Sequence, residues 1–164
     1  MEQEIRWDNT RAVLEQYARQ FVAQYRENLA KGNRNASSRL ADTVKAEVEV
    51  SETTISVELT LQDYWYYVDN GRKAGKMPPI SKIEEWIKVK PVIPRPFGKS
   101  QKRIPSPRSV AFLIARKIGR EGTKGTHDLR NASDYTYNAF KAHLEQAIAE
   151  DVGNYTATIF RGAF

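Results

Sequence analysis

Side chains that commonly carry acid–base or metal chemistry are few in this sequence. There is no cysteine, which excludes a thiolate zinc site and a cysteine nucleophile. The two histidines, His127 and His143, have no carboxylate or second histidine at ligand spacing. Glu84 and Glu85 are adjacent on a predicted helix, so they point in different directions and do not form a catalytic pair. We therefore expect no catalytic residue, no metal site and no cofactor, and an enzyme is the minority hypothesis.

A glycine-rich segment, Gly119–Gly125, has a superficial similarity to a phosphate-binding loop. It follows a predicted helix rather than a strand, and it lacks the Gly-Lys-Ser/Thr ending of such loops. The sequence therefore favours an ordinary helix terminus followed by a flexible turn.

Positive charge is concentrated in one region of the chain. The net charge is +6 in total, but Arg95 to Lys124 holds nine basic residues and one acid, a net +8, so the remainder sums to −2. A regional excess of this kind needs a regional explanation. The nine basic residues are Arg95, Lys99, Lys102, Arg103, Arg108, Arg116, Lys117, Arg120 and Lys124.

Three interpretations of this basic, proline-rich region stay open. It is a solvated loop, the usual fate of a charge run, or an extended segment that becomes ordered against a neighbouring subunit. We hold these two as equal. The third interpretation, contact with nucleic-acid phosphates, ranks behind both. The segment offers a single aromatic residue, Phe97, for base stacking, and no helix-turn-helix, zinc-finger or RNA-recognition signature is present.

Four consecutive aromatic residues, Tyr64 to Tyr67, are the most conspicuous apolar cluster. Because they cannot all be buried on one face of a helix or strand, we expect at least one to contact a partner and the others to join the core. Residues 63–72 as a whole fit either a strand or one or two helical turns ended at Asn70-Gly71.

Hydrophobic periodicity predicts an α+β fold. Spacings of three and four residues predict an N-terminal helix over about 8–31, two shorter helices over about 81–90 and 107–120, and a long C-terminal helix over about 133–152. Strict alternation predicts an antiparallel hairpin over 43–50 and 54–61. Residues 154–160 have β character and are the candidate third strand of this sheet.

Helix-capping residues refine these boundaries. Asp8, Asn9 or Thr10 is expected to cap the first helix, and Gly32 to end it in a left-handed conformation. Ser81 to Glu84 has the pattern of a capping box. The remaining two helices are predicted to begin with Ser106, followed by a proline at the first helical position, and with Ser133.

Length and composition are those of one folded domain over 1–164. The chain has 40% hydrophobic and 28% charged residues, which is typical of a globular protein with its own core. An extended, proline-rich basic loop interrupts it at about 91–107, where aperiodic sequence predicts no helix or strand. The N-terminus is not a signal peptide, and no apolar run is long enough for a membrane span. We therefore expect a soluble protein.

Three stretches taken together resemble one protein family. They are Tyr66–Pro79, Ile83–Ile87 and Ala111–Thr123. Their order is similar to that in the neck, head–tail connector and tail-completion proteins of tailed bacteriophages, which also begin with an amphipathic helix and end with a long one. The proline-rich segment at 91–107 has no counterpart in this resemblance.

The resemblance implies a structural virion protein rather than an enzyme. It would form a homo-oligomeric ring, six-fold or twelve-fold, that joins the head and portal to the tail and lines the DNA exit channel. Its partners would be other neck, portal-adaptor or tail-tube proteins, with sequence-independent proximity to packaged DNA and no membrane. It would be assembled in the host cytoplasm and reside in the virion. The alternative from another class is a free nucleic-acid-binding protein that uses residues 95–124.

On this hypothesis two surfaces make the contacts between subunits or neighbours. One is a shaped loop, Tyr66–Pro79, at the ring interface or lumen. The other is the basic region, Arg95–Lys124, which would meet an acidic neighbour or the passing DNA. The residues expected to make these contacts are Tyr66, Tyr67, Asp69, Gly71, Arg72, Lys76, Pro78, Pro79, Arg95, Lys99, Lys102, Arg103 and Arg108.

Overall fold

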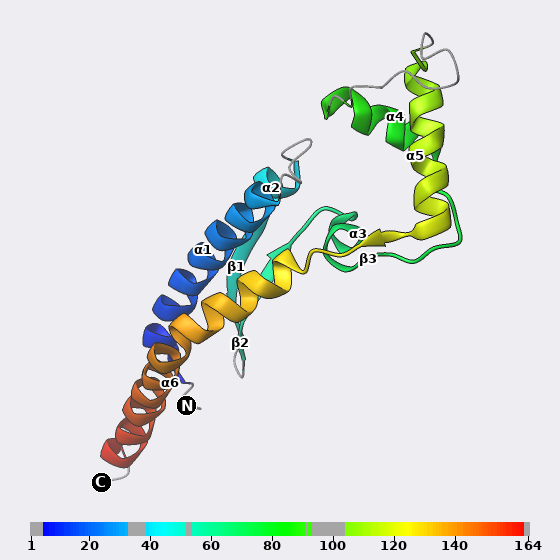
Figure 1. Cartoon of the computed structure of the whole chain (residues 1–164). Coiled ribbons are helices and arrows are strands. Elements are labelled where there is room, and N and C mark those ends of the chain that lie inside the picture. Colours follow the sequence, from blue (N-terminus) through cyan, green and yellow to red (C-terminus); the bar gives the residue numbers. More distant parts are fainter. Residues whose placement is uncertain (1–4, 33–38, 52–53, 91, 93–103, 163–164) are drawn as a thin grey trace.

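A computed structural model of the chain describes residues 5–32, 39–51, 54–90, 92 and 104–162. It confirms the α+β class (Figure 1). The elements in chain order are α1 (Asp8–Lys31), α2 (Arg39–Thr43), β1 (Lys45–Val50), β2 (Ile55–Thr60), α3 (Trp65–Asn70), β3 (Gly71–Arg72), α4 (Ile80–Val89), α5 (Pro107–Glu121), β4 (Thr123–Lys124) and α6 (Asp128–Gly162).

The body of the molecule is built from α1, α6 and the β1–β2 hairpin. The apolar stripe of α1 supplies Phe21, Tyr25 and Leu29 to the core, and each is almost completely buried. Burial of side chains of this size stabilises the fold by about 1.5–3 kcal/mol each. The rest of the core cluster is Leu40, Ala41, Val44 and Ala132. The core therefore lies where α1, α2 and the start of α6 meet.

The hairpin follows the predicted alternation. β1 and β2 pair antiparallel, with Val48 opposite Val57 and Glu47 opposite Glu58. The valines belong to the face that α1 partly covers, and the glutamates belong to the opposite, exposed face. A two-stranded sheet is marginal alone, so the hairpin depends on its contact with α1.

Helices α1 and α6 run antiparallel, and three contacts along their length fix the register. Near the start of α6, the Asn28 side-chain amide donates to the carbonyl oxygen of Asp128 at 3.1 Å. Further along, Tyr17 meets Phe140 edge to face, with ring centroids 6.1 Å apart. At the other end of the pair, Asp151 accepts hydrogen bonds from the first turn of α1.

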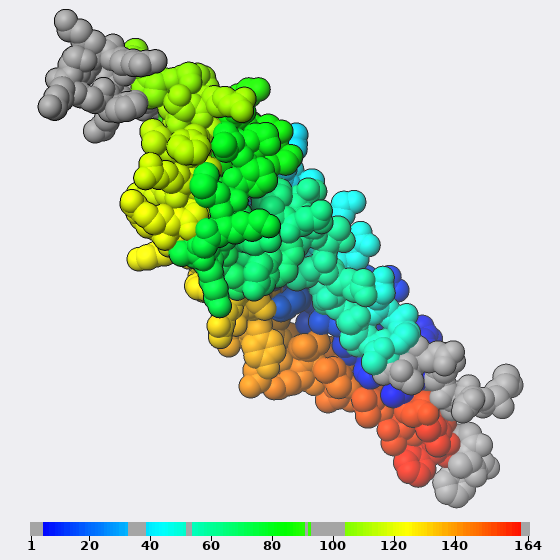
Figure 2. All heavy atoms as spheres, turned by 90° about the vertical axis from the view of Figure 1, so that its right-hand side faces the viewer, coloured from blue at the N-terminus to red at the C-terminus, as the bar shows by residue number. Residues whose placement is uncertain are grey.

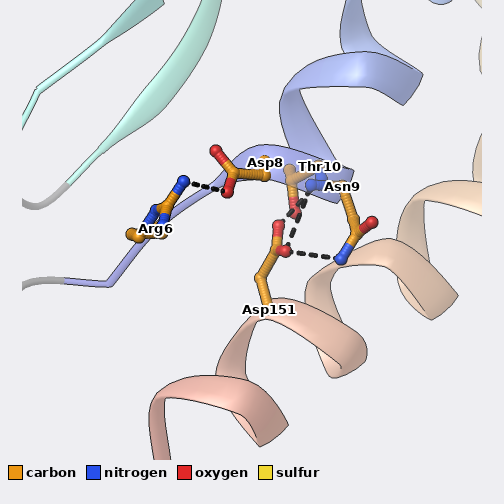
Figure 3. A network of polar contacts seen from close by, with 5 residues as sticks. All are labelled: Arg6, Asp8, Asn9, Thr10 and Asp151. Carbon is orange, nitrogen blue, oxygen red and sulfur yellow. Dashed lines mark hydrogen bonds and ion pairs between the residues drawn. The ribbon is translucent and has the colours of Figure 1, made fainter.

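The Asp151 contact replaces the expected cap of α1 (Figure 3). The helix begins at Asp8 after Trp7, and no side-chain cap is present there. Instead, the backbone N–H groups of Asn9 and Thr10 donate to the two carboxylate oxygens of Asp151 at 3.1 and 2.8 Å. These are the N2 and N3 positions that a local cap would normally satisfy. The prediction of a cap at Asp8, Asn9 or Thr10 is therefore wrong, and the acceptor comes from 141 residues away in the sequence.

A second long-range acceptor, Asp69 at the end of α3, organises the start of α6. Its side chain accepts from the backbone N–H of Leu129 at 2.7 Å. Its backbone oxygen accepts from Thr126 and His127 at 2.9 Å each. His127 has a φ of 55°, a left-handed conformation that is uncommon for a residue other than glycine. The two bonds to one carbonyl hold the tight turn that precedes the helix.

Helices α4 and α5, together called the arm, stand apart from the body. They pack mainly on each other, and the short β3–β4 ribbon lies between the arm and the body (Figure 1). The space-filling view shows the molecule as elongated, with the arm at one end and the end of α6 at the other (Figure 2). Ser106 caps α5 as predicted, by accepting from the Ser109 backbone N–H at 3.2 Å.

The C-terminal part of the chain differs most from expectation. Residues 154–160 are helical and continue α6, so the predicted third strand is wrong. Elongating an existing helix costs little, and the Thr156 and Thr158 hydroxyls bond to carbonyls one turn back. α6 also begins at Asp128, so Ser133 lies inside it rather than capping it.

Other boundaries shift by a few residues. α4 begins at Ile80 after Pro79 and has no side-chain cap, so the capping box at Ser81 to Glu84 is not formed. Gly32 follows α1 but has a φ of −72°, so it is not left-handed. Residues 63–72 prove to be one short helix, α3, followed by the two-residue strand β3. Most of the proline-rich segment lies outside the described residues.

Candidate functional site

The aromatic cluster divides between the core and the solvent. Trp65 packs partly buried against the core cluster, whereas Tyr66 and Tyr67 are 55% and 56% exposed. The guanidinium of Arg72 lies 5.5 Å from the Tyr67 ring centroid, in cation–π geometry. Tyr67 is therefore held beside a cation. The partner expected for the exposed tyrosines stays a prediction.

Several of the predicted contact residues have roles inside the chain. Asp69 is buried and engaged with α6. Gly71 has a φ of 75°, and a Cβ there would collide with the backbone of Thr123 and Gly125 across the ribbon. Pro78 is buried, whereas Lys76 and Pro79 are exposed. Whether any of these residues meets a second chain stays a prediction, and the exposed ones are the better placed.

The basic region is only partly described. Arg95, Lys99, Lys102 and Arg103 lie outside the described residues. Arg108 is exposed in the first turn of α5. The acid of this helix, Glu121, is shared by Lys117 at 4.0 Å and Arg120 at 2.5 Å. The hydrogen bond from Arg120 is the main cause that lowers the pKa of Glu121; desolvation opposes it, and the charges of Arg120 and Lys117 lower the pKa further.

The packing of the arm leaves apolar side chains uncovered. α5 turns small residues, Ala111, Ala115 and Gly119, inward, and a Cβ at Gly119 would collide with Met77. None of the ten described residues of α4 is buried. The exposed apolar side chains of the two helices are Trp86, Val89, Phe112 and Leu113, which are 39 to 52% exposed.

One face of α5 combines this apolar exposure with positive charge. Phe112 and Leu113 are 44% and 46% exposed, and Arg116 and Arg120 follow them on the same side of the helix. α5 buries Val110, Ala111, Ala115 and Gly119 on a neighbouring side of the helix. These four residues are called the basic face below.

The outer surface of the hairpin is acidic. Glu47, Glu49 and Glu58 are exposed on the same face, and Glu47 lies directly opposite Glu58 in the register. Like charges in opposed positions destabilise a hairpin. None of the three glutamates forms an ion pair with another described residue. They are called the acidic face below. Sequence reasoning assigned them to a solvent face without singling them out, because only the register brings Glu47 against Glu58.

A groove of about 480 Å³ lies between α1, β2, α3 and α6. Its apolar lining includes Phe21, Val57 and Trp65. Among its charged residues, Asp69 is engaged with α6 and Arg130 pairs with Asp134 at 3.9 Å. Its carboxylates thus have structural partners. In the described part of the chain, no group of three histidine, aspartate or glutamate side chains is arranged to hold a metal ion.

A second exposed apolar surface lies along the distal half of α6. It consists of Ile148, Val152, Ile159 and Phe160, which are 38 to 63% exposed. The sequence predicted an apolar stripe through Tyr137, Phe140, Leu144, Ile148 and Val152. The residues that α6 buries are instead Asp128, Ala132, Thr136, Ala147 and Asp151, mostly on a neighbouring side of the helix.

Comparison with protein-family models, with curated proteins and with solved structures finds no match for this chain. None of the described helices combines the length and the apolar character needed to cross a membrane. The function of the chain is therefore inferred from its surfaces.

Proposed function

We propose that this chain is a structural protein of the tailed-bacteriophage neck. It assembles with copies of itself into a ring, and the ring joins the head and portal complex to the tail and lines the DNA exit channel. The protein acts in the virion through its contact surfaces and not as an enzyme. The motifs at Tyr66–Pro79, Ile83–Ile87 and Ala111–Thr123 suggest this family.

The observation that carries the proposal is the exposed arm. A helix normally buries an apolar stripe against another element, yet α4 buries no residue among its ten. Trp86 and Val89 stay 39% and 52% exposed there. Contiguous exposed apolar surface of this kind is typical of proteins whose contacts are completed by a partner. An assembling subunit explains the arm, because a neighbouring copy covers what the single chain leaves open.

Sedimentation velocity of the purified full chain, followed by negative-stain electron microscopy, tests the proposal. We expect one discrete assembly larger than a dimer, visible as a closed ring with a central channel. A protein that stays monomeric up to its solubility limit, or one that forms only isologous dimers, contradicts the ring. The symmetry of the ring images also decides between six-fold and twelve-fold assembly.

A free nucleic-acid-binding protein is the second candidate, and the basic face of α5 favours it. Arg116 and Arg120 are both exposed on α5, so they are accessible to phosphates. A titration with duplex DNA at several salt concentrations separates the candidates. Sub-micromolar affinity with a steep salt dependence supports the second candidate. Weak binding, with the same affinity for unrelated sequences, supports a ring protein that is only close to DNA.

A further inference from the structure

The basic face of α5 and the acidic face of the hairpin have complementary charge. α5 carries four basic residues and one acid, whereas β1 and β2 carry three glutamates and one lysine. Figure 1 shows the hairpin beside α1 in the body and α5 in the arm, so the two faces belong to different parts of the molecule. A single chain does not bring them together.

Each face has an unfavourable feature that contact with a neighbouring copy would remove. The repulsion between Glu47 and Glu58, which are directly opposed, is removed when cations approach the outer surface of the hairpin. Phe112 and Leu113 supply an apolar centre on α5, with Arg116 and Arg120 beside them. An apolar centre with a charged rim is the usual composition of a protein–protein interface.

Charge also decides which faces can meet. A two-fold contact through α5 would place arginines against arginines, and a two-fold contact through the hairpin would place glutamates against glutamates. Only a contact in which the two different faces meet brings opposite charges together, either reciprocally across a two-fold axis or heterologously from copy to copy. The proposed ring requires the heterologous arrangement. Such a contact repeats from copy to copy and either closes into a ring or continues as a filament.

We propose that the basic face of α5 in one copy binds the acidic face of the hairpin in the next copy. Arg116 and Arg120 lie against Glu47 and Glu58 of the neighbour, and this head-to-tail contact is the repeating interface of the assembly. The inference extends the proposed ring and rests on it for closure. The contact itself does not require that the assembly close.

Charge reversal with compensation tests the contact in the full chain. One variant carries Glu47→Lys and Glu58→Lys, and the other carries Arg116→Glu and Arg120→Glu. Sedimentation velocity is expected to show that each variant alone is monomeric, because like charges then meet at every interface. An equimolar mixture is expected to recover the wild-type mass, since each reversed face finds its complement on the other variant. A chain that carries all four changes is expected to assemble alone.

A matched control changes charge elsewhere by the same amount. Arg11→Glu with Lys141→Glu reverses two exposed cations on α1 and α6, and this variant is expected to assemble as the wild type does. Circular dichroism melting of every variant checks that the monomers are folded. For a variant that fails to fold, a salt titration of the wild-type assembly replaces it. Raising salt from about 0.1 to 1 M shortens the screening length from about 10 to 3 Å and should dissociate the contact.

The outcomes separate this inference from the ring. If the wild type forms a ring and both reversed variants form it equally well, the contact is refuted and the ring stands. Loss of assembly in the control variant, or a mixture that stays monomeric, also refutes the contact. If the wild type forms open filaments that charge reversal dissolves, the contact stands and the ring is refuted. A wild type that stays monomeric refutes both.

Discussion

Asp151 offers the most direct test of how α1 and α6 are held together. Its side chain is 2% exposed and accepts three hydrogen bonds, from the backbone N–H groups of Asn9 and Thr10 and from the Asn9 side-chain amide at 2.9 Å. In Asp151→Ala, the buried N–H of Thr10 loses its acceptor, which costs about 1–3 kcal/mol. Loss of a negative charge at a helix N-terminus adds about 0.3–1 kcal/mol. Including the partly buried Asn9 groups, we expect a total loss of about 3 kcal/mol in the free energy of unfolding.

The measurement is urea denaturation followed by far-UV circular dichroism at one fixed protein concentration, because assembly changes apparent stability. For a chain of this length, a loss of about 3 kcal/mol corresponds to a fall in melting temperature of roughly 6–12 °C. Asp151→Asn keeps an acceptor but no charge, so it should lose about half as much. Glu150→Gln, on the exposed neighbouring residue, is the matched control and should stay within about 0.5 kcal/mol of the wild type.

The pH dependence of the same variants tests the charge. Burial raises the pKa of Asp151, but hydrogen bonds from Thr10 and Asn9 outweigh this effect, so the pKa lies below its usual value. A carboxylate with a depressed pKa stabilises the fold above its unfolded pKa, and this contribution disappears as the pH falls through the folded pKa. The gap between the wild type and Asp151→Asn should therefore be full at neutral pH and shrink below about pH 4. If the wild type and Asp151→Asn differ in free energy of unfolding by the same amount at neutral pH and below about pH 4, the assigned role of the charge is refuted.

Three further substitutions test the buried hydroxyl of Tyr25 and two glycines, Gly122 and Gly153. Tyr25→Phe removes a buried hydroxyl without a described hydrogen-bond partner, so urea denaturation should show equal or up to about 1 kcal/mol greater stability. Burial and, secondarily, the charges of Asp69 and Asp128 raise the pKa of Tyr25, so the wild type should lose more stability than Tyr25→Phe above about pH 10. Gly122→Ala should lower the free energy of unfolding by at least about 1 kcal/mol, because Gly122 has a φ of 73° and an added Cβ would collide with the Arg72 backbone. An unchanged free energy of unfolding would contradict the ribbon geometry. Gly153→Ala, in open space within α6, is its control and should gain about 0.5–1 kcal/mol.

Local patterns predicted the elements whose burial is regular. The α1 range of 8–31 is correct at both ends because its apolar stripe is a local signal, although its cap and the left-handed Gly32 were wrongly predicted. The hairpin and the limits of α5 follow the sequence for the same reason. The end of α6 could not be predicted in this way. Its β-branched residues favour a strand, but the described chain places no neighbouring strand there for them to pair with.

The contacts that set the tertiary arrangement have no local signal at all. Asp151 and Asp69 each satisfy the first turn of another helix, at separations of 141 and 60 residues. In sequence, each is one more aspartate on a helix. The β3–β4 ribbon is only two residues long on each side, too short to produce a periodic pattern. Its signal is Gly71 and Gly122, and their meaning depends on the strand that each one faces.

The candidate surfaces were predictable to different degrees. Exposure of some of the four aromatics followed from their number alone; Tyr64, Tyr66 and Tyr67 are exposed, the last two most. The basic region was visible as a charge imbalance, although only the orientation of α5 shows which of its arginines lie together. The acidic face was not anticipated, because alternating glutamates are ordinary on the outer side of a strand. It becomes informative only when the register opposes Glu47 to Glu58.

The internal roles of Asp69, Gly71 and Gly122 bear on assembly even without a contact to a second chain. A ring closes only when the angle between successive copies is constant, so its two contact faces need a fixed relation within each copy. Here the basic face lies on the arm and the acidic face lies on the body. The connection between them passes through the β3–β4 ribbon and through Asp69, which is hydrogen-bonded to the start of α6. Asp69 joins α3 to the start of α6 through three hydrogen bonds, and the two glycines allow the ribbon strands to approach closely. These residues therefore set the angle between the two faces, and with it the size of any ring that the contact builds.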